Sequence, residues 1–116
     1  MLRKSRAQAL SHDSTGFAVL DDGGNRHPYS WDGVLRATAF KRDLLTVDLI
    51  CIAFDLAGGT AIELHEELVG WDSFVHALPS YLPGVPAYES WWRDVAVPAF
   101  EPNETLLFER QEFVAG

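Results

Sequence analysis

The sequence predicts an α+β fold, in which an antiparallel sheet of about five to six strands carries one or two helices on one side. Segments rich in β-branched and aromatic residues, separated by glycine-rich turns, fill the first half of the chain. After residue 70 the apolar residues recur at spacings of three and four, which is the period of an amphipathic helix. A strand-like segment then returns near the C-terminus, so the helices are expected between strands.

Length and composition indicate one globular domain. The chain has 116 residues, of which 47% are hydrophobic and 22% are charged. We place the α+β domain at residues 16–116. Residues 1–15 are polar and lack periodicity, so we interpret them as a flexible tail.

Three strands are predicted in the first part of the domain. "GFAVLD" at 16–21 has the composition of a short strand, and "DDGGN" at 21–25 that of a turn. "HPYSW" at 27–31 predicts a second strand, with Pro28 at a sheet edge or at the strand start, because proline cannot donate to a central ladder. "GVLRATAFK" at 33–41 predicts the third.

A hairpin is predicted next. "LTVDLICIAFDL" at 45–56 is apolar on both faces and predicts a central strand. "AGG" at 57–59 supplies a turn, and "TAIELHE" at 60–66 returns as the partner strand. Side chains alternate between the faces of a strand, so one face carries Ile62 and Leu64 and the other carries Glu63 and His65.

The apolar period then becomes helical. "GWDSFVHALPSYLPG" at 70–84 predicts a helix that begins near Asp72 or Ser73. Pro79 inside this pattern is expected to kink the helix or to split it.

A second short helix and a closing strand complete the prediction. "AYESWWRDV" at 87–95 is the helix, and "ETLLFER" at 104–110 is the strand. Consecutive helical residues lie about 100° apart, so we expect one of Trp91 and Trp92 in the core and the other at its edge. Trp31 and Trp71 are expected in the core.

The charge is strongly negative and unevenly distributed. The net charge is −8, and three of the nine basic residues lie in the first six, so the other residues carry six basic and 17 acidic groups. No Lys or Arg occurs between Arg42 and Arg93, an interval with eight acidic residues. Such a domain repels phosphate backbones, and we expect no nucleic-acid partner.

We expect no membrane partner and a cytoplasmic location. The longest apolar run is Leu49–Phe54, six residues, whereas a spanning helix needs about 20. The N-terminus lacks the apolar stretch of a secretory signal. The single cysteine, Cys51, lies within this apolar run and is interpreted as a buried, unreactive thiol.

One motif suggests chemistry. In "LHEELVGWD" at 64–72, His65 is followed by Glu, as in the zinc-protease motif His-Glu-x-x-His. The fourth residue after His65 is Val69, so the second histidine ligand is missing and the protease motif is excluded. Alternation still places Glu63, His65 and Glu67 on one face, which leaves a metal site or a small enzyme as a minor alternative.

No other segment predicts an active site. Ser11, His12 and Asp13 are the residue types of a hydrolase triad, but three successive residues cannot converge in the required order. Lys41 and Arg42 form the one cationic pair in the folded region; they are interpreted either as partners of a nearby acid or as an anion or protein contact. We expect no catalytic residues, no cofactor and no metal.

The layout has a known counterpart. A curved antiparallel sheet closed by a helix resembles small pleckstrin-homology-like bacterial domains, from which the added "WWRDV…LLFER" segment departs. "WDGVLRATAFKRDLLTVDLIC" at 31–51 and "GWDSFVHALPSYLPGVP" at 70–86 resemble a group of short bacterial proteins without an assigned activity. This resemblance covers about half of the chain and implies no function.

These observations predict a non-catalytic protein-binding module, in concrete form a small acidic immunity or inhibitor protein that neutralises a basic partner. An acidic face would steer the partner, and an exposed tryptophan beside it would be the anchor. The predicted partner-binding residues are Glu63, Glu66, Glu67, Asp72, Trp92 and Arg93. The alternative is a homo-oligomeric or scaffold domain of pleckstrin-homology-like layout.

Overall fold

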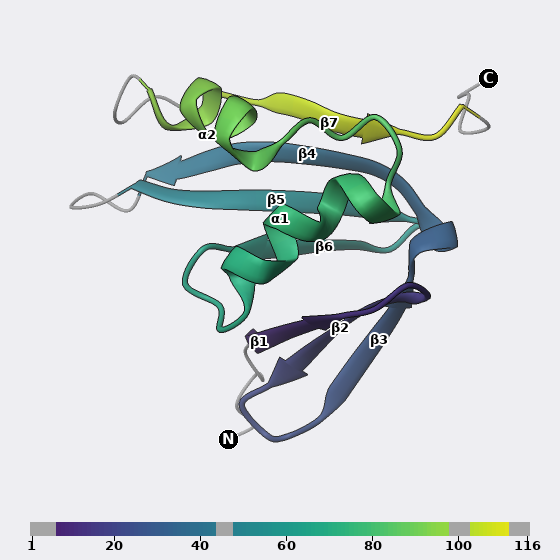
Figure 1. Ribbon diagram of the computed structural model, residues 1–116. Helices are drawn as coiled ribbons and strands as arrows, with labels where there is room; N and C mark the ends of the chain where they lie inside the picture. Colours follow the sequence, from purple (N-terminus) through teal and green to yellow (C-terminus); the bar gives the residue numbers. More distant parts are fainter. Residues whose placement is uncertain (1–6, 44–47, 98–102, 112–116) are drawn as a thin grey trace.

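The α+β prediction is confirmed by the computed structural model, which describes residues 7–43, 48–97 and 103–111. The described residues form seven strands in two antiparallel sheets, with two α-helices late in the chain (Figure 1). The smaller sheet has the order β1-β2-β3, with strands β1 (Ala7–His12), β2 (Gly16–Asp21) and β3 (Arg26–Ser30). The larger sheet has the order β6-β5-β4-β7, with strands β4 (Val34–Asp43), β5 (Asp48–Leu56), β6 (Ala61–His65) and β7 (Thr105–Glu109).

The sheets are joined by a short 3-10 helix, η1 (Trp31–Gly33), and both helices lie on the same face of the larger sheet (Figure 1). They are α1 (Trp71–Tyr81) and α2 (Tyr88–Ala96). As predicted for "ETLLFER", a strand follows the two helices, and this strand, β7, pairs with β4.

The prediction of a flexible tail at residues 1–15 is wrong for residues 7–15, because strand β1 begins at Ala7. Residues 1–6 lie outside the described part. β1 pairs with β2, and on its other side it bonds to a segment distant in sequence. The Leu10 N–H donates to the Val69 carbonyl at 2.7 Å, and the Val69 N–H donates to the Gln8 carbonyl at 3.1 Å. Tertiary partners therefore order a segment whose own composition predicts no structure.

The β5–β6 hairpin follows the prediction. β5 lies between β4 and β6, and residues 45–47 of the predicted strand are outside the described part. Gly58 and Gly59, in the turn, have φ of 94° and 88°, a conformation that glycine adopts without strain.

Helix α1 begins differently from the prediction. Gly70 precedes it with φ of 92° and no side-chain cap, so neither Asp72 nor Ser73 is the capping residue. A Cβ on Gly70 would lie 2.4 Å from the Leu10 carbonyl oxygen, because β1 passes directly beside the turn. The helix runs unbroken through Pro79, whose missing N–H affects only the last turn.

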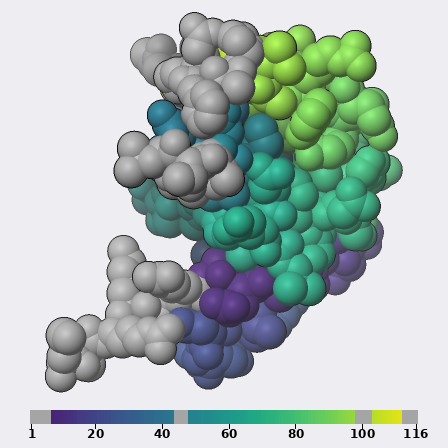
Figure 2. All heavy atoms as spheres, turned by 90° about the vertical axis from the view of Figure 1, so that its left-hand side faces the viewer, coloured from purple at the N-terminus to yellow at the C-terminus, as the bar shows by residue number. Residues whose placement is uncertain are grey.

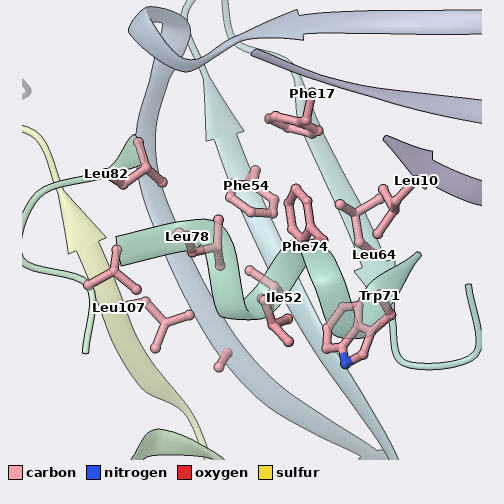
Figure 3. Close-up of a cluster of buried hydrophobic side chains, with 14 of the residues drawn as sticks. Leu10, Phe17, Ile52, Phe54, Leu64, Trp71, Phe74, Leu78, Leu82 and Leu107 are labelled. Atoms are coloured by element: carbon pink, nitrogen blue, oxygen red, sulfur yellow. The ribbon is translucent and has the colours of Figure 1, made fainter. Parts of the chain in front are cut away.

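An aromatic cluster fills the space between the two sheets and α1 (Figure 3). Phe17 from β2 is its centre: its ring centroid lies 4.9 Å from that of Trp31, 5.2 Å from Phe54 and 5.5 Å from Phe74. Trp31 and Trp71 are buried, as predicted. One side chain thus contacts both sheets and the helix.

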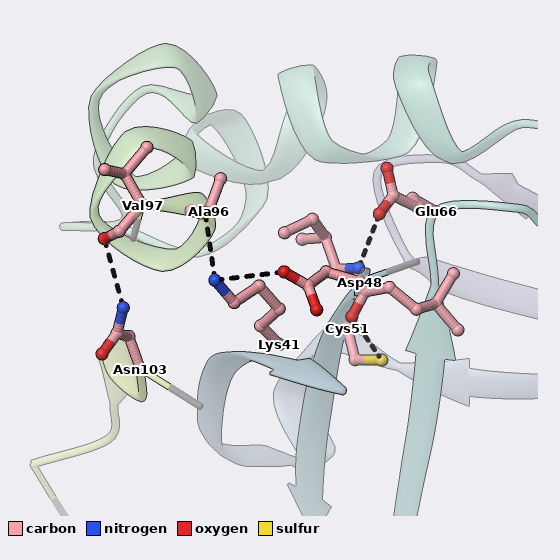
Figure 4. A network of polar contacts seen from close by, with 9 residues as sticks. Lys41, Asp48, Cys51, Glu66, Ala96, Val97 and Asn103 are labelled. Carbon is pink, nitrogen blue, oxygen red and sulfur yellow. Dashed lines mark hydrogen bonds and ion pairs between the residues drawn. The ribbon is translucent and has the colours of Figure 1, made fainter. Parts of the chain in front are cut away.

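A buried lysine holds α2 on the larger sheet (Figure 4). Lys41 of β4 donates from Nζ to the Ala96 carbonyl at 3.0 Å and forms an ion pair with Asp48 at 3.4 Å. Ala96 ends α2, where the helix dipole favours a cation. The alternative of an anion contact at Lys41 is therefore wrong, because this side chain is buried against its own helix.

Cys51 is buried as predicted, and burial raises the pKa of its thiol to about 11. The thiol therefore stays protonated at neutral pH. In the described ranges, no helix is long and apolar enough to cross a membrane.

Replacing Phe17 tests the packing account. Phe17→Ala should lower the free energy of unfolding by about 3–5 kcal/mol, because it removes the ring shared by both sheets. Denaturant unfolding followed by tryptophan fluorescence measures the loss. Leu106→Ala is the control: Leu106 is 54% exposed, so its truncation should cost less than about 0.5 kcal/mol. Equal losses in the two variants would contradict the account.

Candidate partner-binding surface

Two adjoining hollows run along β6. The first, of about 750 Å³, lies between β6 and the smaller sheet and is lined by Ala7, Val19, Asp21, Asn25, His27, Tyr29, Ile62, Glu63 and Leu64. The second, of about 490 Å³, is lined by Ala7, Gln8, Glu63, His65, Glu67 and Leu68. Ala7 and Glu63 line both hollows, so we name them together the inter-sheet groove. Figure 2 views the side where the surface is indented between the N-terminal strands and the larger sheet.

The groove exists because side-chain size differs between the two ends of the sheet contact. At one end, Phe17 and its aromatic neighbours fill the space. At the other end the strands present the smaller side chains of Ala7 and Val19, which line the first hollow together with residues of β6. The walls there include Ile62 and Leu64, so the groove has an apolar floor.

The charge of the groove is negative. Its lining includes the carboxylates of Asp21, Glu63 and Glu67, whereas no described Lys or Arg lines either hollow. The lining also includes the imidazoles of His27 and His65 and the phenol of Tyr29. A groove of this kind attracts cations.

Asp21 is held as a carboxylate. Its Oδ1 accepts the N–H groups of Gly23 and Asn25, each at 2.9 Å, and its Oδ2 lies 2.8 Å from His27 Nε2. The hydrogen bond from His27, followed by that from the Asn25 backbone, lowers the pKa of Asp21 from 3.8 to about 2. Asp21 is therefore ionised at neutral pH although the residue is buried.

Glu63 lies at the rim and is partly neutralised. Its Oε1 accepts from Arg42 Nη2 at 2.5 Å, and both side chains are exposed. Arg42 reaches Glu63 across the outer face of the larger sheet. The two residues of the predicted cationic pair therefore have different environments: Lys41 is buried, and Arg42 binds a carboxylate of β6. An exposed pair of this kind contributes little to stability.

Glu66, a predicted partner-binding residue, lines neither hollow and is bonded within the chain. Its Oε2 accepts the Ile50 N–H at 2.6 Å, while its own N–H donates to the Ile50 carbonyl at 3.0 Å (Figure 4). The side chain replaces a backbone acceptor at the end of the β5–β6 ladder. Alternation alone could not distinguish this role from an exposed one.

Asp72 lies beyond the groove, in the first turn of α1, with its side chain 89% exposed. It adjoins a contact between the helices: His76 Nδ1 lies 2.7 Å from the Asp72 carbonyl oxygen, and Nε2 lies 3.0 Å from Oε1 of Glu89 on α2. The bond to the Asp72 carbonyl, and then that to Glu89, raises the pKa of His76.

Trp92 and Arg93 lie on α2, away from the groove. Trp91 is buried and Trp92 is 40% exposed, which confirms the predicted division of the pair. However, neither Trp92 nor Arg93 lines either hollow. The predicted single surface therefore separates into an acidic groove and a helical surface.

The minor alternatives gain no support from the geometry. Glu63, His65 and Glu67 share one hollow, but within the described ranges no group of three or more His, Cys, Asp or Glu residues could hold a metal ion. His65 Nδ1 accepts the Glu67 N–H at 3.3 Å.

The Ser11-His12-Asp13 segment forms no triad. The His12 ring nitrogens lie 3.1 Å from the Tyr81 hydroxyl and 2.9 Å from Ser73 Oγ, both on α1. Asp13 instead closes a turn by accepting from Thr15 and Gly16. These contacts fasten β1 to the helix.

Sequence reasoning missed the wall formed by the smaller sheet. Asp21, Asn25 and His27 belong to one hairpin, and the spacing Asp-x-Gly-x-Asn indicates a side-chain-closed turn. Nothing in that spacing indicates that β6 lies opposite, since this follows from the packing of two sheets.

Comparisons with models of known protein families, with curated proteins and with solved structures give no match. The groove is therefore interpreted from its own chemistry.

The ionisation of Asp21 predicts acid sensitivity. Because its pKa is lowered in the fold, the carboxylate stabilises the protein above pH 3.8, and this contribution is lost as the pH falls towards about 2. Asp21→Asn should be less stable than the wild type at neutral pH, and the difference should disappear at the acidic end of this range. Urea unfolding at a series of pH values measures this, and a difference independent of pH would contradict it.

Proposed function

We propose that this chain is a non-catalytic module that binds a basic protein at the inter-sheet groove, and that it acts as an immunity or inhibitor protein. The cytoplasm is the proposed location, where a reducing environment suits the single buried thiol of Cys51.

The observation that carries this proposal is the groove itself. Three carboxylates from β2, β6 and the following turn line it, and among the described residues no Lys or Arg does. The whole chain carries a net charge of −8, so its field steers cationic partners while the groove supplies the local contacts.

Neutralisation follows from the same charges. A protein that acts on an anionic substrate carries a cationic surface at its active cleft. An acidic protein seated over that cleft excludes the substrate, both by occupying space and by pairing with the cationic side chains. The apolar floor at Ile62 and Leu64 adds an area that loses contact with water on binding.

Catalysis is the weaker interpretation. Asp21 orients His27, as a carboxylate orients a catalytic base. A triad of this kind also needs a hydroxyl or thiol for the histidine to activate, and among the described lining residues of this hollow there is no Ser, Thr or Cys. We therefore favour binding.

A second candidate rests on α2. Trp92 is 40% exposed and Val97, directly after the helix, is 60% exposed. Such a surface suits a homo-oligomeric or scaffold domain of pleckstrin-homology-like layout. Association through apolar residues tolerates salt, whereas association through the groove weakens with salt.

Charge neutralisation at the groove tests the first proposal. Tagged wild-type chain is used to capture proteins from the cells that make it, at about 50 mM and about 500 mM NaCl. A basic protein should be captured at low salt and lost at high salt. Glu63→Gln with Glu67→Gln should slow its association by about tenfold, measured by biolayer interferometry with the purified partner.

A matched variant controls for net charge. Asp94→Asn with Glu104→Gln removes the same charge from exposed residues that line neither hollow, and it should bind like the wild type. Equal loss in both variants would indicate a response to net charge alone and would contradict a role for the groove. Self-capture that is insensitive to salt would favour the scaffold candidate.

A further inference from the structure

We propose that the free edge of β6 binds an extended cationic segment of the partner as an additional antiparallel strand. This inference rests on the proposed function and specifies how the groove recognises a basic protein. It concerns the backbone of β6, whereas the proposed function depends on side-chain charge.

The hydrogen-bond register shows which backbone groups of β6 face the groove. At one end of the hairpin, the Leu56 N–H donates to the Thr60 carbonyl; at the other, the Glu66 N–H donates to the Ile50 carbonyl. The pairs between them, Phe54 with Ile62 and Ile52 with Leu64, keep the same register. Hydrogen-bonded pairs alternate in an antiparallel ladder, so Ile62 and Leu64 bond to β5.

The intervening residues direct their backbone groups away from β5. These residues are Ala61, Glu63 and His65. Within the described ranges, the N–H and carbonyl of Ala61 and Glu63 have no hydrogen-bond partner beyond the β5 ladder. The His65 carbonyl already accepts the Leu68 N–H at 3.2 Å. The available edge is therefore centred on Glu63.

Across the groove, the edge of β3 is blocked. The Asp21 N–H donates to the Asn25 carbonyl and the Trp31 N–H to the Thr15 carbonyl, which fixes the register of the β2–β3 ladder. Pro28 pairs with Ala18 at a position that is not hydrogen-bonded, so its missing N–H faces the free edge. A proline there prevents strand addition. The β6 edge has no such residue.

The surroundings of the β6 edge define the sequence of the occupant. An added strand places alternate side chains on the two faces of the sheet. Those beside Ile62 and Leu64 enter the apolar part of the groove, and those beside Glu63 meet the acidic rim with Glu67. The matching segment alternates apolar residues with Lys or Arg, which is the partner chemistry that the charge selects.

The hollow has room for such a segment. Its volume of about 750 Å³ lies within the range of about 300–1,000 Å³ in which proteins enclose ligands. Every strand pair in the larger sheet is antiparallel, so an antiparallel addition extends the existing twist and hydrogen-bond pattern.

Backbone methylation of a synthetic peptide tests this mode. The probe is acetyl-Lys-Val-Lys-Val-Lys-Tyr-amide, titrated into the full chain and followed by isothermal titration calorimetry. In an antiparallel addition with valine in the groove, the lysine opposite Glu63 exchanges both hydrogen bonds with it. N-methylation of two amides, those of the second and third lysines, should weaken binding by about tenfold or more, because those bonds are lost.

The isomer with N-methyl groups on the valine amides is the matched control. Its charge, mass and side chains are the same, but its methyl groups point away from β6, so its affinity should stay close to that of the parent peptide. Equal binding of all three peptides would overturn strand addition.

A variant of the protein gives a second measurement. Ala61→Pro removes an edge N–H without changing the net charge or the hydrogen bonds to β5. It should lower the affinity for the parent peptide, whereas Ala61→Thr, which keeps this N–H, should leave the affinity unchanged. Unchanged binding to a folded Ala61→Pro chain would overturn the proposal. If no peptide binds but binding of the natural partner still requires Glu63 and Glu67, strand addition is wrong and the proposed function stands. If, in addition, partner binding does not require Glu63 and Glu67, the proposed function is wrong as well.

Discussion

Phe17 is the side chain on which the assembly of this protein depends. It projects from the central strand of the smaller sheet and contacts Trp31 at the junction, Phe54 of the larger sheet and Phe74 of α1. At the end of the two sheets that is distant from Phe17, other side chains must fill the space between them. There the smaller side chains of Ala7 and Val19, from β1 and β2, line the groove. The large aromatic residues at one end and the small residues at the other therefore create the site.

The acidic composition of the chain is divided among several roles. Asp48 pairs with buried Lys41 beneath α2, Glu66 completes the β5–β6 ladder, and Glu89 joins the two helices through His76. The groove owes its negative charge to Glu67, to Glu63, which is paired with Arg42, and to the buried Asp21, which is bonded to His27. Net charge alone thus overstates the number of acids that can meet a partner. What distinguishes the groove is that its carboxylates lie beside a strand edge to which no described strand pairs.

Much of the fold could be predicted from the sequence, because β2, β5, β6 and α1 have the strand or helix period in their own residues. β1 could not, since its order depends on backbone bonds to Val69. The same limit applied to the site. Alternation predicts that Glu63 and Glu67 share a face, and both line one hollow, whereas the hydrogen bond of Glu66 depends on the direction of one carboxylate. Asp21 and the separation of Trp92 from the acidic residues follow from the packing of distant elements, which no local pattern contains.

The central claim is that β6 presents an open edge at an acidic groove. Amide hydrogen exchange of the free protein, followed by NMR, tests it most directly. The account predicts alternation along β6: the amides of Ile62 and Leu64 exchange slowly, because they bond to β5, and those of Ala61 and Glu63 exchange rapidly. Slow exchange at all four amides, unchanged on dilution, would contradict the account, because the edge would then be paired within the chain itself.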